Sequence, residues 1–159
     1  MTTSNASMIE TAQQAINAAR HCWVLGLKVE SIAAANLTLS LPYSPQIIGN
    51  PENGVIHGGA LTTLLDTTCG FSVAIALNIF MITPTLDLRI DYMTSAKPNL
   101  TVYATAEVYR ITKHVVFCRG TAYQDDISKP IAYCVATFMR PPEPSNSHPQ
   151  SKPEIPHEQ

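Results

Sequence analysis

The residues best suited to chemistry lie in one stretch near the middle of the chain. His57, Gly58 and Gly59 directly precede a long apolar run, and Asp66 lies within that run. Two glycines at the start of a helix let a ligand approach the backbone closely, and the first N–H groups of a helix have no carbonyl partner within it. These groups also lie at the positive end of the helix dipole. They are candidate donors to a carbonyl oxygen that gains negative charge, an interaction worth about 3 kcal/mol in a transition state.

Asp66 is the only carboxylate of the apolar run. A buried carboxylate without partners costs several kcal/mol, and such residues are often functional. Asp66 could attack a carbonyl carbon or deprotonate a water. The alternative is a structural carboxylate bonded to the hydroxyls of Thr62 or Thr63. Taken alone, His57 likewise fits a structural histidine at a helix start, and the two glycines fit close packing there.

Residues 57–77 contain no proline, which predicts one long and mostly buried helix. Its large apolar residues fall on one side. A narrow stripe of small and polar residues falls on the other, namely Gly59, Thr62, Thr63, Asp66 and Gly70.

The spacing of the donor and the carboxylate predicts a shared site. Gly58 and Asp66 lie about 12 Å apart along the helix axis, from the helical rise per residue. A base or nucleophile and an oxyanion donor must each come within roughly 3 Å of the same carbonyl group. If both act on one carbonyl, they belong to different subunits of a two-fold dimer with the two helices antiparallel across the interface.

The flanking segments predict the frame that holds these residues. An amphipathic helix is expected over Ser7 to Cys22, a strand over Ala34 to Leu41 and a loop over Ser44 to Gly54. The remaining strands are expected at residues 82–92, Leu100 to Thr112, Val115 to Tyr123 and Ile131 to Phe138.

These elements predict an α+β fold in which an antiparallel sheet of about five strands wraps around the long central helix, with the N-terminal helix on the outside. We expect residues 1–140 to form a single domain. Residues 141–159 are rich in proline and polar residues and are expected to be a disordered tail.

Composition narrows the function classes. Ten Lys and Arg against twelve Asp and Glu give a net charge of −2, which argues against nucleic acid as a main partner. The four cysteines lack zinc spacing and predict buried thiols in a reducing compartment, with no metal site. The apolar segment from Phe71 to Ile82 is shorter than the roughly 20 residues that span a bilayer. The first ten residues lack the pattern of a secretory signal, so we expect a cytoplasmic protein without a membrane anchor.

The central motif resembles that of a known family. The pattern consists of Gly54, His57-Gly58-Gly59, Asp66, Gly70 and the later run Thr85-Leu86-Asp87-Leu88. It is similar to that of the hotdog-fold acyl-CoA thioesterases of the phenylacetic-acid-degradation (PaaI) type, and the likeness covers about Leu27 to Met139. In one departure, Pro51 stands where relatives often have Asn six residues before the His, with Asn50 and Asn53 on either side.

The resemblance implies a hotdog fold and roles for particular residues. Asp66 would be the general base or nucleophile, the Gly58 N–H would polarise the thioester carbonyl, His57 would help to orient the thioester, and Thr85 would hold a hydroxyl near the attacking water. Further substrate contacts are expected from Asn50, Asn53, Gly59 and Thr63. The substrate would be an acyl-CoA, no cofactor would be needed, and the protein would be a homodimer or a dimer of dimers.

Several alternatives remain open from the sequence. Thr85 also fits an ordinary strand residue. The basic residues could bind the phosphates of coenzyme A or simply form a solvated surface: Arg89, Arg110, Lys113, His114 and Arg119. The runner-up function is a non-catalytic acyl-CoA-binding or regulatory protein of the same fold. A hydratase or dehydratase on a related fold fits the His-Gly-Gly pattern less well.

Overall fold

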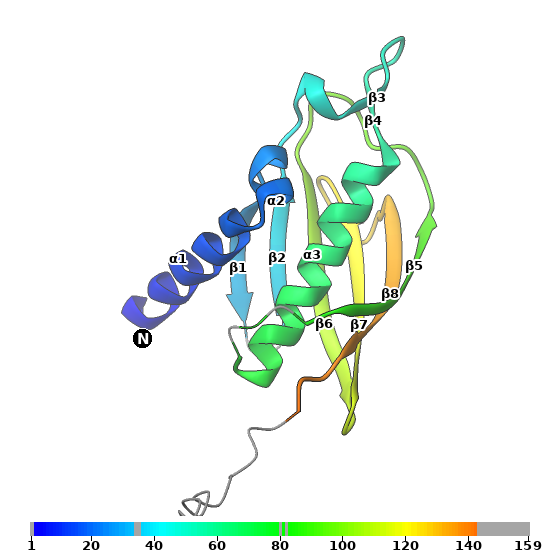
Figure 1. The fold of residues 1–159 in the computed structure, drawn as a ribbon. Coiled ribbons are helices and arrows are strands. Elements are labelled where there is room, and N and C mark those ends of the chain that lie inside the picture. Colours follow the sequence, from blue (N-terminus) through cyan, green and yellow to red (C-terminus); the bar gives the residue numbers. More distant parts are fainter. Residues whose placement is uncertain (1, 34–35, 80, 82, 143–159) are drawn as a thin grey trace, which may run out of the picture.

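Most of the strands form one main sheet, and the helices lie on one side of it (Figure 1). The computed structural model describes residues 2–33, 36–79, 81 and 83–142. Its elements follow the chain in this order: α1 (Thr2–Ala18), α2 (Arg20–Leu25), β1 (Lys28–Ala33), β2 (Asn36–Leu41), the short 3₁₀ helix η1 (Pro45–Ile47), β3 (Ile48–Asn50), β4 (Val55–Ile56), α3 (Gly58–Leu77), β5 (Thr85–Tyr92), β6 (Val102–Ile111), β7 (Val115–Tyr123) and β8 (Ala132–Met139).

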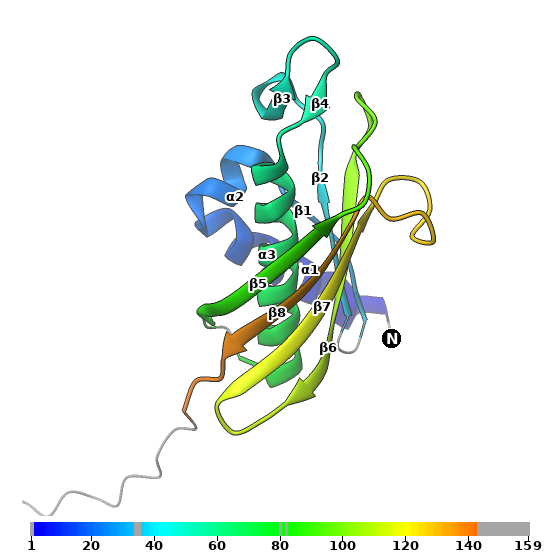
Figure 2. The same ribbon diagram turned by 90° about the vertical axis from the view of Figure 1, so that its right-hand side faces the viewer.

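The main sheet has six strands in the order β1-β2-β6-β7-β8-β5, and every neighbouring pair is antiparallel. The long helix α3 crosses one face of this sheet (Figures 1 and 2). Leu64, Leu65, Cys69 and Val73 of α3 are fully buried. The predicted α+β arrangement of an antiparallel sheet around a long central helix is confirmed.

The central strands alternate between a buried face and an outer face. Along β7, Val116, Cys118 and Ala122 are buried, whereas Phe117 and Arg119 lie on the other face. Successive side chains of a strand point to opposite sides, which accounts for this period of two. The predicted bounds of β7 match the structure, and those of β6 and β8 differ by one or two residues.

The two edge strands of the sheet, β1 and β5, differ in the partners of their outer backbone groups. At the β1 edge, the side chain of Gln13 in α1 donates from Nε2 to the Leu27 carbonyl (3.0 Å) and accepts from the Val29 N–H (2.7 Å). These two bonds occupy backbone groups that another strand would otherwise pair with. At the other edge, β5 pairs only with β8 among the described residues, and Leu86 and Tyr92 are half exposed.

The strand expected over Ala34 to Leu41 is present as β2, but the strand before it, β1, was not predicted. The sheet therefore has six strands instead of about five. The register of β1 shifts between Val29 and Ser31, which interrupts the alternation that marks a strand in a sequence. Residues 34 and 35 lie outside the described residues.

The expected N-terminal helix over Ser7 to Cys22 is two helices. The chain leaves the helical conformation at Ala19, with φ −76° and ψ 101°, and then forms α2. This change of direction brings α2 against α3, where the Cys22 thiol lies 3.5 Å from the Thr67 hydroxyl. Gly26, at φ 70°, ends α2 in the left-handed conformation that glycine adopts without strain.

The predicted disordered tail lies outside the described residues from residue 143 onward. By length and composition alone, α3 could cross a bilayer. In this fold α3 is instead the core helix of the sheet, with Leu64 and Leu65 buried.

Candidate active site

His57 begins α3 as its N-cap. Its Nδ1 accepts a hydrogen bond of 2.9 Å from the Gly59 N–H, and its own N–H donates to the Ile47 carbonyl at 2.8 Å. Gly49 packs directly on this residue, since a Cβ on Gly49 would lie 2.8 Å from the His57 Cα. Because Nδ1 is an acceptor, the neutral ring carries its proton on Nε2. The structure therefore gives His57 a positioning role at the helix start.

Gly58 is the first residue of α3, and its N–H has no hydrogen-bond partner among the residues that the structure describes. The Tyr92 hydroxyl, from the end of β5, donates to the Gly58 carbonyl at 3.1 Å and lies 2.9 Å from the Thr62 hydroxyl. A Cβ on Gly58 would lie 3.6 Å from that same tyrosine hydroxyl, an ordinary contact. Tyr92 thus joins the end of β5 to the start of α3.

Asp66 lies beside Thr85, at the opposite end of β5 from Tyr92. The Thr85 hydroxyl donates to Asp66 Oδ1 at 2.9 Å, although the two residues are 19 positions apart in the chain. Asp66 is half-buried, and Thr85 is exposed in the single chain. The Thr62 and Thr63 hydroxyls donate to the Gly58 and Gly59 carbonyls, so the alternative in which they hold Asp66 is not the arrangement of this structure.

Thr63 faces α2. His21 of α2 places its Nε2 3.2 Å from the Thr63 hydroxyl, and both residues lie near the start of α3. Nothing in the sequence pointed to His21, because a hydrogen bond over 42 residues depends on the turn between α1 and α2. Tyr92 was missed for a similar reason, since its contacts depend on how β5 packs against α3.

Asn50 and Asn53 use their carboxamide oxygens within their own loop. Asn50 Oδ1 accepts from the Glu52 N–H at 3.0 Å, and Asn53 Oδ1 accepts from the Val55 N–H at 3.1 Å. The loop between β3 and β4 lies beyond the N-terminal end of α3 (Figure 1). The two asparagines therefore lie at the Gly58 end of the helix and away from the level of Asp66.

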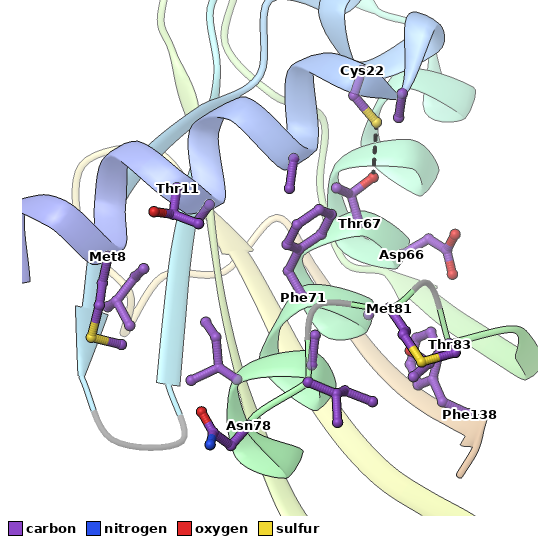
Figure 3. Close-up of a pocket in the computed structure, with 18 of the residues that line it drawn as sticks. Met8, Thr11, Cys22, Asp66, Thr67, Phe71, Asn78, Met81, Thr83 and Phe138 are labelled. Carbon is purple, nitrogen blue, oxygen red and sulfur yellow. Dashed lines mark hydrogen bonds between the residues drawn. The ribbon is translucent and has the colours of Figure 1, made fainter. Parts of the chain in front are cut away.

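A cavity of about 610 Å³ opens next to Asp66 and Thr85. It lies between α1 and the face of α3 that carries Thr67 and Phe71 (Figure 3). Most of its lining side chains are apolar or small, as is usual for pockets that bind small molecules. The sequence did not reveal this cavity, since it depends on how α1 is placed against α3.

Three buried thiols meet between α3 and the sheet, Cys69 from α3, Cys118 from β7 and Cys134 from β8. Cys69 Sγ lies 3.6 Å from Cys134 Sγ, and Cys118 is also buried. Hydrogen bonding with Cys118 and with Cys134, together with burial, raises the pKa of Cys69 well above its usual value. The hydrogen bond with Cys69 lowers the pKa of Cys134, while burial and the nearby Asp66 carboxylate oppose that change. All four cysteines are free and buried, as predicted.

The basic residues are only partly available to a ligand. Arg89 forms an exposed ion pair with Asp91 at 3.0 Å, and Arg119 forms one with Glu107. Exposed pairs of this kind contribute at most about 1 kcal/mol to stability, so a phosphate could displace either carboxylate. Within the described residues, no group of three or more His, Cys, Asp or Glu side chains is arranged to hold a metal ion.

The central part of the chain matches a known protein class. Residues 53–131, which contain α3 and strands β5 to β7, match the thioesterase superfamily. The chain belongs to that superfamily and is, at this level, a thioester hydrolase. The resemblance to the hotdog thioesterases is thus confirmed.

Among individual relatives, the chain is 26% identical over 155 residues to the medium/long-chain acyl-CoA thioesterase YigI of Salmonella typhimurium, covering 84% of this chain and 98% of that protein. It is 33% identical over 90 residues to a Halobacterium salinarum protein that is named an esterase, and this match spans 55% of the chain but only 58% of the relative's length.

Solved structures agree with the fold. A Pseudomonas aeruginosa protein is 59% identical, with a TM-score of 0.76, over 83% of this chain and 98% of that one. The phenylacetic acid degradation protein PaaI from Thermus thermophilus, solved as a point mutant, is 23% identical with a TM-score of 0.64, over 76% and 98% of the two chains. At that identity the likeness concerns the fold alone.

Proposed function

We propose that this protein hydrolyses acyl-CoA thioesters in a site shared by two subunits. Asp66 of one subunit is the general base or nucleophile, and the Gly58 N–H of the other is the oxyanion donor. The observation that carries the proposal is that β5 contacts both halves of the site, with Thr85 at one end bonded to Asp66 and Tyr92 at the other bonded to Gly58.

The edge position of β5 supports the dimer. An exposed, apolar edge strand is a template for pairing with another chain. β5 pairs only with β8 among the described residues, and Leu86 (54% exposed) and Tyr92 (50% exposed) lie on it beside the charged Asp87, Arg89 and Asp91, whereas the β1 edge is occupied by Gln13. A second copy of this chain is the partner that a two-fold, antiparallel β5 pairing requires.

Antiparallel pairing of two β5 strands also brings the two halves together. The strand is about 24 Å long at ~3.4 Å per residue, so within one subunit Thr85 and Tyr92 are far apart. In the antiparallel pair, the Thr85 end of one strand lies opposite the Tyr92 end of the other. Asp66 of one subunit then approaches Gly58 of its partner, which agrees with the spacing of the two residues along α3.

The chemistry follows from the free groups at this junction. Thr85 occupies Asp66 Oδ1, and the second carboxylate oxygen is left to take a proton from water or to attack the thioester carbon directly. The carbonyl oxygen gains negative charge in either route, and the Gly58 N–H stabilises it. Collapse of the intermediate breaks the carbon–sulfur bond, and the thiolate of coenzyme A leaves and takes up a proton. In the direct-attack route this leaves an anhydride between the acyl group and Asp66, which a water then hydrolyses to release the acid and regenerate the carboxylate. The net reaction consumes one water and yields a carboxylic acid and a thiol.

The remaining predicted residues take supporting roles in this proposal. His57 holds the first turn of α3 so that the Gly58 N–H points outward, and its Nε2–H is available to contact the substrate. Asn50, Asn53, Gly59 and Thr63 lie around the same end of the helix, where we expect the coenzyme A portion to pass. The exposed apolar residues Tyr109, Tyr133 and Val135 on the strands of the sheet support a dimer of dimers.

The test compares Asp66→Asn with Asp125→Asn, which makes the same change in an exposed turn. Thiol release is measured on acetyl-, octanoyl- and benzoyl-CoA, and the oligomeric state by light scattering. We expect kcat of Asp66→Asn to fall by about two orders of magnitude or more with the dimer intact, since acid–base groups contribute that much. Asp125→Asn should match the wild type.

Unchanged turnover in Asp66→Asn would discard the mechanism. A wild-type protein that binds acyl-CoA in calorimetry but releases no thiol would instead establish the non-catalytic acyl-CoA-binding alternative.

A further inference from the structure

The cavity between α1 and α3 is continuous with the Asp66–Thr85 pair, since both residues belong to its lining (Figure 3). Its volume of about 610 Å³ falls within the range of about 300–1,000 Å³ that is typical of small-molecule sites. Whatever group extends from a thioester carbonyl held at Asp66 has direct access to this space.

Along α3 the cavity follows a track of small residues. Asp66, Gly70, Ala74 and Asn78 all line it, and their spacing of four residues places each beside the next, so the track turns gradually around the helix. The track runs for about 18 Å at ~1.5 Å per residue. Ala74 contributes only a methyl group to the cavity wall, and a Cβ on Gly70 would lie 3.3 Å from the ring of Phe138, which also lines the cavity.

The opposite wall comes from α1. Met8, Ala12, Ala15 and Ala19 line the cavity from that side, while Phe71 and Ile75 of α3 flank the track. Among the lining residues that the structure describes, Asp66 is the only acidic or basic side chain. The space beyond Asp66 therefore offers no partner for a charged group and favours a long, uncharged, apolar ligand.

We propose that this cavity binds a straight aliphatic acyl chain, which extends from the carbonyl at Asp66 past Gly70 and Ala74 toward Asn78, with α1 as the outer wall. This inference rests on the proposed thioesterase function and names its substrate class. Ala74 and Ala15 set the accessible length, because a larger side chain at either one would block the track partway along.

Chain length should then control catalytic efficiency. Each methylene transferred from water into the cavity increases kcat/KM by about fourfold, from the transfer free energy of a CH₂ group. We expect kcat/KM to rise along the series butanoyl-, hexanoyl-, octanoyl-, decanoyl- and dodecanoyl-CoA, and benzoyl-CoA to rank with the short chains. Equal rates across the series, or a preference for benzoyl-CoA, would overturn the inference while leaving the hydrolysis proposal intact.

Two substitutions from opposite walls test the placement. In Ala74→Leu and in Ala15→Leu, the ratio of kcat/KM for dodecanoyl-CoA to that for hexanoyl-CoA should fall at least about tenfold, as the loss of a few buried methylenes implies. The matched control is Ala18→Leu, the same change on α1 at an exposed residue outside the cavity, and it should keep the wild-type ratio. If one cavity variant does not fold, the other carries the test; a wild-type ratio in a folded variant contradicts the placement.

A binding measurement separates the two proposals. Calorimetric titration of Asp66→Asn with hexanoyl- and dodecanoyl-CoA should give tighter binding and a more negative heat-capacity change for the longer chain, as burial of apolar surface requires. Ala74→Leu in the same background should remove that difference. If the affinity does not depend on chain length, the cavity assignment is wrong, whether or not the protein hydrolyses thioesters. If the affinity does depend on chain length but no thioester is hydrolysed, only the proposed reaction is wrong.

Discussion

At the scale of single residues, the Gly58 amide can be removed without breaking the helix that carries it. Proline is well tolerated at the first position of a helix, where its missing N–H has no partner in the helix anyway. The preceding residue must be extended, and His57 is, at φ −63° and ψ 134°. Gly58→Pro therefore removes the donor, whereas Gly58→Ala keeps it and adds a methyl group at an ordinary distance from Tyr92.

We expect kcat of Gly58→Pro to fall by a factor of about 10² to 10³, the usual effect of losing one oxyanion-hole donor. Gly58→Ala should stay close to the wild type. Thiol release gives the rates, and circular dichroism with thermal melting checks that α3 survives. Equal rates in the two variants would mean that the Gly58 N–H does not act on the substrate.

The Thr85 hydroxyl gives a second residue-scale prediction. Thr85→Val keeps the shape of the side chain but removes the hydrogen bond to Asp66 Oδ1, so the carboxylate loses a fixed orientation. We expect kcat to fall by about tenfold, the lower bound for a hydrogen bond to a charged group. Thr85→Ser should restore most of the rate. Thr121→Val, the same change on β7, is the control, and a similar loss there would point to a general effect on the sheet.

The sequence predicted the part of the site that lies on a single helix. His57, Gly58 and Asp66 fall on α3 at fixed spacing, so their relative positions follow from helix geometry alone. The bond between Thr85 and Asp66 and the contacts of Tyr92 and His21 depend on how separate elements pack, which spacing along the chain does not encode.

At the scale of elements, α3 and the sheet come into close contact at Gly120. A Cβ there would lie 2.9 Å from Cys134 Sγ and 3.3 Å from Cys69 Sγ, and Gly120 is directly paired with Cys134 across β7 and β8. The absence of a side chain at this position of β7 thus makes room for the thiols that fill the space under α3.

Gly120→Ala should accordingly lower the free energy of unfolding by about 1–3 kcal/mol, the usual cost of overpacking a core. Combining it with Cys134→Ala, which removes the obstructing sulfur, should cost less than the sum of the single changes. Combining it with Cys22→Ala, a buried thiol in α2, should give a simple sum. Urea denaturation at one fixed protein concentration measures all of these variants, and additivity in the Cys134 double variant would contradict the close contact.

The sequence predicted elements well where one pattern persisted over a whole element. The β-rich runs of β6, β7 and β8 were found within two residues of their bounds, and α3 contains no proline that would break a helix. The shift between Val29 and Ser31 concealed β1, and no glycine or proline marks the break at Ala19 between α1 and α2. The register shift in β1 and the break at Ala19 both lie near the place where Gln13 of α1 bonds to the backbone of Leu27 and Val29. That contact is tertiary, so a pattern along the sequence does not show it.

At the scale of the whole molecule, the proposed dimer depends on one asymmetry of the sheet. Gln13 satisfies backbone groups at the β1 edge, whereas β5 pairs only with β8 among the described residues and exposes Leu86 and Tyr92. A two-fold pair through β5 would bury Leu86 and Tyr92 and would assemble two sites, each from the Asp66 end of one strand and the Gly58 end of the other.

A shared site predicts recovery of activity in a mixed dimer. Asp66→Asn and Gly58→Pro homodimers each carry a defect in both sites. In a heterodimer of the two variants, both defects fall in the same site, because Asp66 of one subunit works with Gly58 of its partner. The other site is then intact. A heterodimer isolated through two different affinity tags should therefore turn over acyl-CoA at about half of the wild-type rate per dimer, since one of the two symmetric sites is restored. If Asp66 worked with the Gly58 of its own chain, every site in the heterodimer would keep one defect and its rate would stay at the level of the two homodimers.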